Sequence, residues 1–126
     1  MSTDDRLRPH PHDRLSEAVH RIDLADAVRR LRNEPLAAED GHRQITLVRD
    51  GPVSLILFAF EPGATLKEHR APGVISIHAL SGRLQVSAGS ATHDLPAGTV
   101  LTLGPGTPHA VHAVDMSDML LTVART

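Results

Sequence analysis

Histidines are the residues of this chain best suited to carry out chemistry. His69 and His78 lie close together in the stretch "EHRAPGVISIHALSG", and His109 ends the later stretch "GPGTPH". A neutral imidazole can ligate a transition metal, accept a hydrogen bond from an organic ligand, or exchange a proton near neutral pH. We therefore take His69 and His109 as candidate ligand-binding residues, and all three histidines as a candidate set of metal ligands.

Lys67 is a further candidate for ligand binding. It lies two residues before His69 in "TLKEH", and side chains two apart on a strand point to the same face. We therefore expect its ammonium group beside His69, where it would bind an anionic group such as a carboxylate. The alternative is a surface lysine whose charged end reaches solvent.

The composition argues against several classes of function. The 126 residues include 13 basic and 15 acidic side chains, two aromatic ones and no cysteine. Nucleic-acid binding normally requires a positively charged surface, and thiolate sites require cysteine. No apolar run approaches the roughly 18 residues of a membrane span, and the charged start lacks an apolar signal segment. We therefore expect a cytoplasmic protein with no nucleic-acid or membrane partner.

The chain divides into three parts. Residues 1–16 hold charges, prolines and histidines but few apolar residues, which predicts a disordered N-terminal tail. Residues 17–41 contain a short helix in "LADAVRRLRNEP", with Asp23 placed as its N-cap and Pro35 as its stop signal. Residues 42–126 form a β domain.

The β domain has the pattern of a small all-β fold. Gly- and Pro-containing turns such as "EPGA", "SGR" and "PAG" separate short apolar segments. This punctuation is typical of an antiparallel sandwich or barrel rather than a parallel sheet. About nine strands are expected, in the segments "HRQITLVRD", "VSLILFAF", "TLKEH", "VISIHAL", "LQVS", "THDL", "TVLTL", "HAVHAV" and "MLLTVA".

Two stretches of this domain resemble the sequence motifs of the cupins, which are small jelly-roll barrels. Gly63, His69 and Gly82 have the spacing of the first motif, and Gly98 with "GPGTPH", ending at His109, is similar to the second. The resemblance covers roughly residues 42–124. It implies a small single-domain cupin with an all-β, double-stranded β-helix fold (jelly-roll barrel) and a short N-terminal helix.

The resemblance also implies a metal site, but this chain departs from the motif. Cupins usually hold a divalent transition metal (Fe, Mn, Ni, Cu or Zn) with three histidines and a glutamate. Those positions correspond here to His69, Ala71, Ile75 and His109. Because the affinity of a metal site follows the number and type of its ligands, two histidines alone predict weak binding.

His78 is the candidate third ligand, and the sequence leaves its direction open. Strict alternation from Ile75 places His78 on the opposite face of the strand, away from the barrel interior. A β-bulge between the two residues would turn it inward.

Three functions are compatible with these residues. The first, which we favour, is binding of a small-molecule ligand in the barrel mouth through His69, His109 and Lys67. The second is a metal-dependent dioxygenase or isomerase that uses His69, His109 and a third ligand such as His78, with the metal as Lewis acid. The third is a structural role in a larger assembly, with the barrel filled by side chains. The apolar strand "VISIHAL" also predicts a homodimer, because a second copy would cover it.

Overall fold

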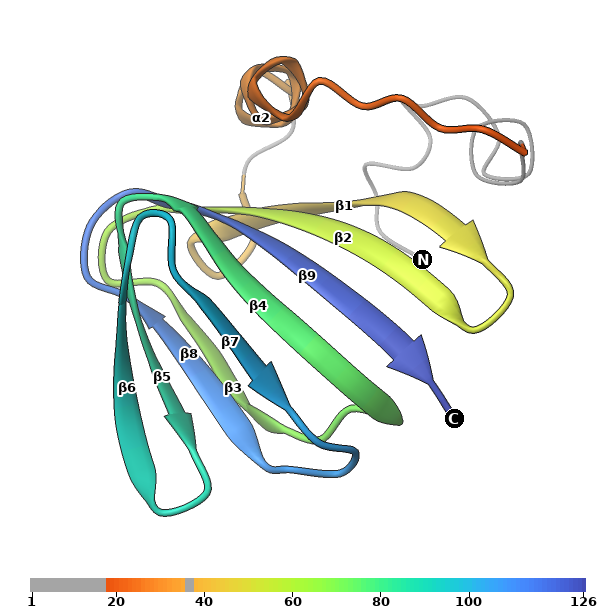
Figure 1. The fold of residues 1–126 in the computed structure, drawn as a ribbon. Helices are drawn as coiled ribbons and strands as arrows, with labels where there is room; N and C mark the ends of the chain where they lie inside the picture. The colour runs from red at the N-terminus through yellow and green to blue at the C-terminus, as the bar shows by residue number, and fades with distance from the viewer. Residues whose placement is uncertain (1–17, 36–37) are drawn as a thin grey trace.

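The structure, a computed structural model, describes residues 18–35 and 38–126. The prediction of a disordered tail over residues 1–16 lies outside the described residues. Within them, one helix precedes nine strands (Figure 1). The elements are α2 (Leu24–Arg32), β1 (His42–Asp50), β2 (Val53–Phe60), β3 (Thr65–His69), β4 (Gly73–Ser81), β5 (Arg83–Ala88), β6 (Ala91–Pro96), β7 (Val100–Leu103), β8 (His109–Ala113) and β9 (Ser117–Arg125). No helix in this part of the chain is long and apolar enough to cross a membrane.

The helix forms where its capping residue and apolar spacing predict it. The side chain of Asp23 accepts a hydrogen bond of 3.0 Å from the backbone N–H of Asp26, which satisfies one of the free donors of the first turn. The helix ends at Arg32, with Asn33 as its C-cap. Proline disfavours helical backbone at the residue before it, which here is Glu34. The helix therefore ends before it reaches Pro35.

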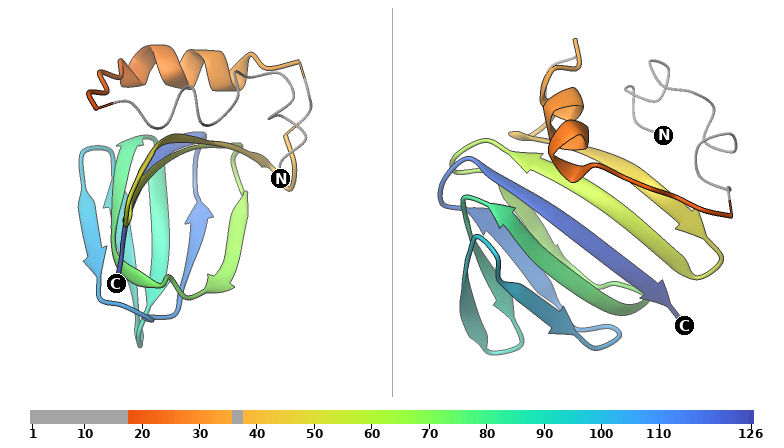
Figure 2. Two further views of the ribbon diagram at one scale, coloured as in Figure 1. Left: turned by 90° about the vertical axis from the view of Figure 1, so that its right-hand side faces the viewer. Right: turned by 45° about the horizontal axis from the view of Figure 1, so that its top comes forward.

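The strands form two sheets packed face to face (Figures 1 and 2). The five-stranded sheet has the order β1-β2-β9-β4-β7, and the four-stranded sheet has the order β3-β8-β5-β6. Neighbouring strands in both sheets are antiparallel. The last strand, β9, lies between β2 and β4, so the pairing joins segments far apart in the sequence. This arrangement confirms the predicted all-β jelly-roll barrel.

The hydrophobic core lies between the two sheets. Ile75, Ile77 and Ala79, which alternate along β4, are at most 2% exposed. They belong to the same cluster as Leu84 and Val86 of β5 in the opposite sheet. Burial of each large aliphatic side chain contributes about 1.5–3 kcal/mol, so this cluster holds the two sheets together.

The helix covers the outer face of the five-stranded sheet at β1 and β2 (Figure 2). Leu31 is 2% exposed and packs in one cluster with Leu57 of β2. Nη2 of Arg32 donates a hydrogen bond of 2.7 Å to Oδ1 of Asp118 on β9. Oδ2 of Asp118 accepts a bond of 2.6 Å from Ser81 on β4. The helix therefore packs on its own barrel, which the sequence alone does not decide.

Candidate functional site

His69 and His109 lie side by side at one end of the four-stranded sheet. His69 is the last residue of β3, His109 is the first of β8, and their Cα atoms are partners in the strand register. Their ring centroids are 4.1 Å apart, with the planes inclined at 61°. The structure thus brings together two of the predicted site residues.

Backbone hydrogen bonds determine which nitrogen of each ring carries the proton. Nδ1 of His69 lies 2.9 Å from the carbonyl oxygen of Lys67, and Nδ1 of His109 lies 3.0 Å from that of Thr107. A carbonyl oxygen only accepts hydrogen bonds, so Nδ1 of each ring is the protonated nitrogen. In the neutral ring, Nε2 then carries a lone pair. Within the described part of the chain, no residue hydrogen-bonds Nε2 of either histidine.

His109 is held in its neutral form. Its side chain is 2% exposed. Burial lowers the pKa of His109 from its ordinary value, the hydrogen bond to Thr107 opposes this shift, and the neighbouring His69 adds to it. His109 is therefore uncharged at neutral pH. It can accept a hydrogen bond from an O–H or N–H group of a ligand.

The lowered pKa of His109 predicts a loss of stability on the acidic side. The unfolded chain takes up a proton on this residue at a pH of about 6.5, whereas the folded chain does so only at lower pH. The contribution of neutral His109 to the free energy of unfolding is therefore complete above about pH 6.5 and falls as the pH drops through the folded pKa. Urea denaturation between about pH 7.5 and pH 5 measures this fall.

His109→Asn provides the comparison, because its amide replaces Nδ1–H but does not titrate. This variant should lose part of the acid-side dependence, whereas His112→Asn, on the exposed face of β8, should keep it. An acid-side slope in His109→Asn equal to that of the unaltered protein would contradict the neutral, buried state of His109.

The two other positions of the cupin metal motif hold aliphatic side chains, which offer no ligand atoms. Ile75 is 2% exposed in the core, and Ala71 packs against the same cluster. The backbone N–H of Gly106 donates to the carbonyl oxygen of Ala71 at 3.1 Å, which joins the loop after β3 to the loop before β8. We call this end of the barrel, defined by His69, Ala71, Ile75 and His109, the mouth.

His78 lies away from the mouth. It is half-buried and alternates with the buried Ile77 and Ala79, so it points to the outer face of the five-stranded sheet. Its register partners are Val100 on β7 and Leu120 on β9. The register of β4 shifts only after Ala79, so no bulge turns His78 inward.

The donor atoms at the mouth do not fit the metal centre that the motif implies. Among the described residues, no group of three or more His, Cys, Asp or Glu side chains is placed to hold a metal ion. Three histidines and a glutamate would be needed, and the mouth supplies two imidazoles next to alanine and isoleucine. A divalent transition metal loses affinity with each missing ligand.

Lys67 does not follow the simple alternation that the sequence suggests. Leu66 is the register partner of Val111, and His69 is the partner of His109, so β3 has one extra residue between these pairs. Such a β-bulge breaks the rule that places Lys67 on the face of His69. The Lys67 side chain is exposed, and its backbone carbonyl is the group that contacts His69. A ligand contact by its ammonium group stays a prediction.

Arg125 is a charged residue at the same end of the barrel that the sequence does not single out. It is the register partner of Gly73, the first residue of β4. Its guanidinium group hydrogen-bonds Oγ of Ser54 at 2.9 Å and the carbonyl oxygen of Gly51 at 3.1 Å. No local motif marks it, because its position depends on the pairing of β9 with β4.

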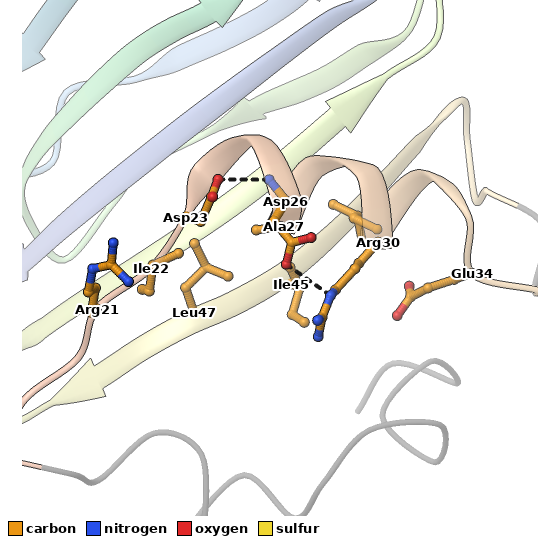
Figure 3. A pocket seen from close by; sticks show the side chains of 10 residues that line it. Arg21, Ile22, Asp23, Asp26, Ala27, Arg30, Glu34, Ile45 and Leu47 are labelled. Atoms are coloured by element: carbon orange, nitrogen blue, oxygen red, sulfur yellow. Dashed lines mark hydrogen bonds and ion pairs between the residues drawn. The ribbon is translucent and has the colours of Figure 1, made fainter.

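A separate cavity of about 280 Å³ lies between α2 and β1 (Figure 3). Its floor is apolar, formed by residues such as Ile45 and Leu47, and charged residues of the helix line its rim. Asp26 pairs with Arg30 at 3.0 Å, and Asp23 already caps the helix (Figure 3). Both rim carboxylates are thus already engaged, whereas Nε2 of each mouth histidine has no hydrogen-bond partner among the described residues.

Comparison with known proteins agrees with this architecture. The family described as "Cupin domain" matches residues 56–124. No curated protein matches the chain by sequence. Among solved structures, a protein of unknown function from Streptococcus pyogenes is 25% identical with a TM-score of 0.70, over 90% of this chain and 92% of that chain.

Two further solved structures are themselves described as cupins. A cupin superfamily protein from Desulfitobacterium hafniense is 20% identical with a TM-score of 0.72, over 90% of this chain and 96% of that chain. An RmlC-like cupin from Desulfovibrio desulfuricans is 26% identical with a TM-score of 0.62, over 73% of this chain and 92% of that chain. The family match over more than half of the chain, together with the jelly-roll barrel, shows that this protein belongs to the cupin family.

Proposed function

We propose that this cupin binds a small organic molecule at the mouth, with His69 and His109 as its polar contacts. The observation that carries the proposal is the state of the two rings. Both Nδ1–H groups are committed to backbone carbonyls, so both Nε2 lone pairs remain for hydrogen bonds from a ligand. A ligand with a hydroxyl or N–H group supplies the missing donor.

The aliphatic residues of the mouth support an organic ligand rather than an inorganic ion. Ile75 belongs to the core cluster and Ala71 packs against it, and neither side chain offers a polar atom. Small-molecule sites are typically apolar surfaces with a few well-placed polar groups. The mouth therefore suits a molecule with a short apolar body and one hydrogen-bond donor. Lys67 remains a predicted contact for an anionic group at the rim.

Nuclear magnetic resonance of the imidazole nitrogens tests this proposal. Short-chain alcohols and primary amides serve as probes, because they carry donors without a charge. We expect the Nε2 resonances of His69 and His109 to move together on addition of at least one probe, and those of His78 and His112 to stay unchanged. Equal changes at all four histidines, or none at any, would contradict binding at the mouth.

We also propose that the chain forms a homodimer through the outer face of β4 and β7. The helix covers the part of the sheet near Leu80, but Val74 and Val100 are 46% and 52% exposed on the uncovered part. Val100 is the register partner of His78, so these side chains share one face. A second copy would remove this apolar surface from water.

Val100→Asp should convert the dimer into a monomer, because an unpaired charge at an apolar contact is costly to bury. Light scattering after size-exclusion chromatography measures the mass. Val19→Asp is the matched control, since Val19 is 79% exposed and lies before the helix. A monomeric unaltered protein, or a Val100→Asp variant that stays dimeric, would contradict this interface.

A further inference from the structure

Arg125 faces the interior side of the five-stranded sheet at the mouth. Val123, two residues earlier on β9, is buried in the core, and alternation places Arg125 on the same face. Ser54, which accepts a hydrogen bond from Arg125, is the register partner of Val123 and is 1% exposed. The guanidinium group therefore lies on the barrel side of β2 and β9 rather than on their outer face.

Backbone contacts join the end of β9 to the loops that carry the two histidines. Arg125 is the register partner of Gly73, and the N–H of Thr126 donates to the carbonyl oxygen of Pro72 at 3.2 Å. Pro72 belongs to the loop that directly follows His69. In Figure 1 the end of β9 lies beside the start of β4, next to this loop. Arg125 and the histidine pair thus border the same mouth from opposite sheets.

The charge of Arg125 has no counter-ion among the described residues. Its hydrogen bonds go to neutral acceptors, one to Ser54 and one to the carbonyl of Gly51. A guanidinium has five N–H donors, so three remain after these two bonds. A half-buried cation is normally paired, because its desolvation is otherwise uncompensated. The two bonds orient the group and leave its remaining donors for a ligand.

Two other arginines show what a structural arginine looks like in this fold. Arg32 bonds Asp118 through both Nε and Nη2 and also donates to the carbonyl of Ser117. Arg83 bonds both carboxylate oxygens of Asp94, at 2.8 and 2.6 Å. Both have a carboxylate partner within the fold, whereas Arg125 has none among the described residues.

The strand register places a second arginine on the same face of the sheet as Arg125. Arg49 on β1 is the register partner of Ser54, so it shares the face of Ser54 and Arg125. Asp50, the next residue, alternates to the other face. Glu68 is exposed on β3 and forms no ion pair with the described residues. The interior face at the mouth is therefore positive on the side of β1, β2 and β9.

We propose that Arg125 binds the carboxylate of the ligand, which makes that ligand a small hydroxycarboxylate. This inference rests on the proposed function and names its ligand class. The guanidinium fork matches a carboxylate through two parallel hydrogen bonds, and the imidazoles accept the bond from the hydroxyl group at the other end. Ser54 and Gly51 position the fork.

Isothermal titration with acids and their matched amides tests this inference. The probes are hydroxybutyrate, hydroxyvalerate and hydroxyhexanoate, each with its hydroxyl on the terminal carbon, and the primary amide of each. At least one acid should bind about tenfold or more tightly than its amide. In Arg125→Gln this preference should disappear, because affinity for the acid falls to that for the amide.

Two further variants keep the test decisive. Arg30→Gln, on the exposed side of α2, changes the net charge by the same amount as Arg125→Gln. It should leave the preference for acid over amide unchanged. Arg125→Lys keeps the charge without the fork and should give an intermediate preference. This variant serves as the test if Arg125→Gln does not fold. Equal affinities for acid and amide in the unaltered protein, a preference that persists in Arg125→Gln, or equally tight binding of inorganic phosphate would overturn the carboxylate assignment.

The same experiment separates this inference from the proposed function. If amides bind and move the imidazole resonances but acids have no advantage, the mouth binds neutral ligands and Arg125 is structural. If acids bind through Arg125 while the resonances of His69 and His109 do not move, the carboxylate site is supported and the histidine contacts are wrong. Failure of every acid, amide and alcohol probe to bind would overturn both.

Discussion

Gly82→Ala should lower the free energy of unfolding by about 2–5 kcal/mol. Gly82 joins β4 to β5 with a φ of +73°, a left-handed conformation that costs an alanine roughly 1–2 kcal/mol. A Cβ atom there would overlap both the carbonyl oxygen of Met116 and Oγ of Ser117. Ser117 is fully buried and accepts a hydrogen bond from the N–H of Arg83, so it cannot move away freely. Urea denaturation measures the loss.

Gly89→Ala is the matched control for this prediction. Gly89 also has a positive φ, +61°, but no atom lies within 4 Å of the position that a Cβ atom would take there. This variant should lose only the conformational part, about 1–2 kcal/mol. Equal losses in the two variants would contradict the close packing of the β4–β5 turn against the β8–β9 turn.

Replacing both mouth histidines should weaken ligand binding. His69→Ala/His109→Ala removes two acceptors and leaves the donor of the ligand without a partner in an apolar site. Leaving that single donor without a partner costs about 1–3 kcal/mol, so affinity should fall by roughly 5- to 150-fold. Isothermal titration with the probe that moves the imidazole resonances most strongly gives the two dissociation constants.

His112→Ala is the control for the double variant. His112 lies on the same strand as His109, is exposed on the opposite face, and bonds Oγ1 of Thr65 at 3.1 Å. Its removal should leave affinity unchanged. If the double variant binds the probe as tightly as the unaltered protein does, the ligand does not contact the mouth histidines.

The secondary structure follows from local patterns in the sequence. The segments "HRQITLVRD" and "VSLILFAF" correspond to β1 and β2 without a shift in their ends. Turns between strands require glycine or proline, so these residues mark the strand ends directly. The helix is equally local, because its N-cap and its stop signal lie within its own sequence. The cupin motifs then supplied the fold that joins these elements.

The directions of single side chains were harder to predict, because they depend on pairing between distant strands. The β-bulge in β3 is seen only in its register with β8. Simple alternation along β3 therefore could not predict which face carries the Lys67 side chain. For His78 the absence of a bulge in the described register decided between two open alternatives. Arg125 reaches the mouth because β9 pairs with β4, and no spacing in the sequence reports that contact.

The most direct test of an organic-ligand site is the metal content of the protein. Tag-free protein is incubated with an excess of iron, manganese, nickel, copper or zinc ions, dialysed, and analysed by mass spectrometry beside His69→Ala/His109→Ala. Two imidazoles next to Ala71 and Ile75 predict a content well below one equivalent per chain, with little difference between the two proteins. A content of about one equivalent per chain that the double variant loses would contradict the account, because the histidine pair would then be part of a metal centre.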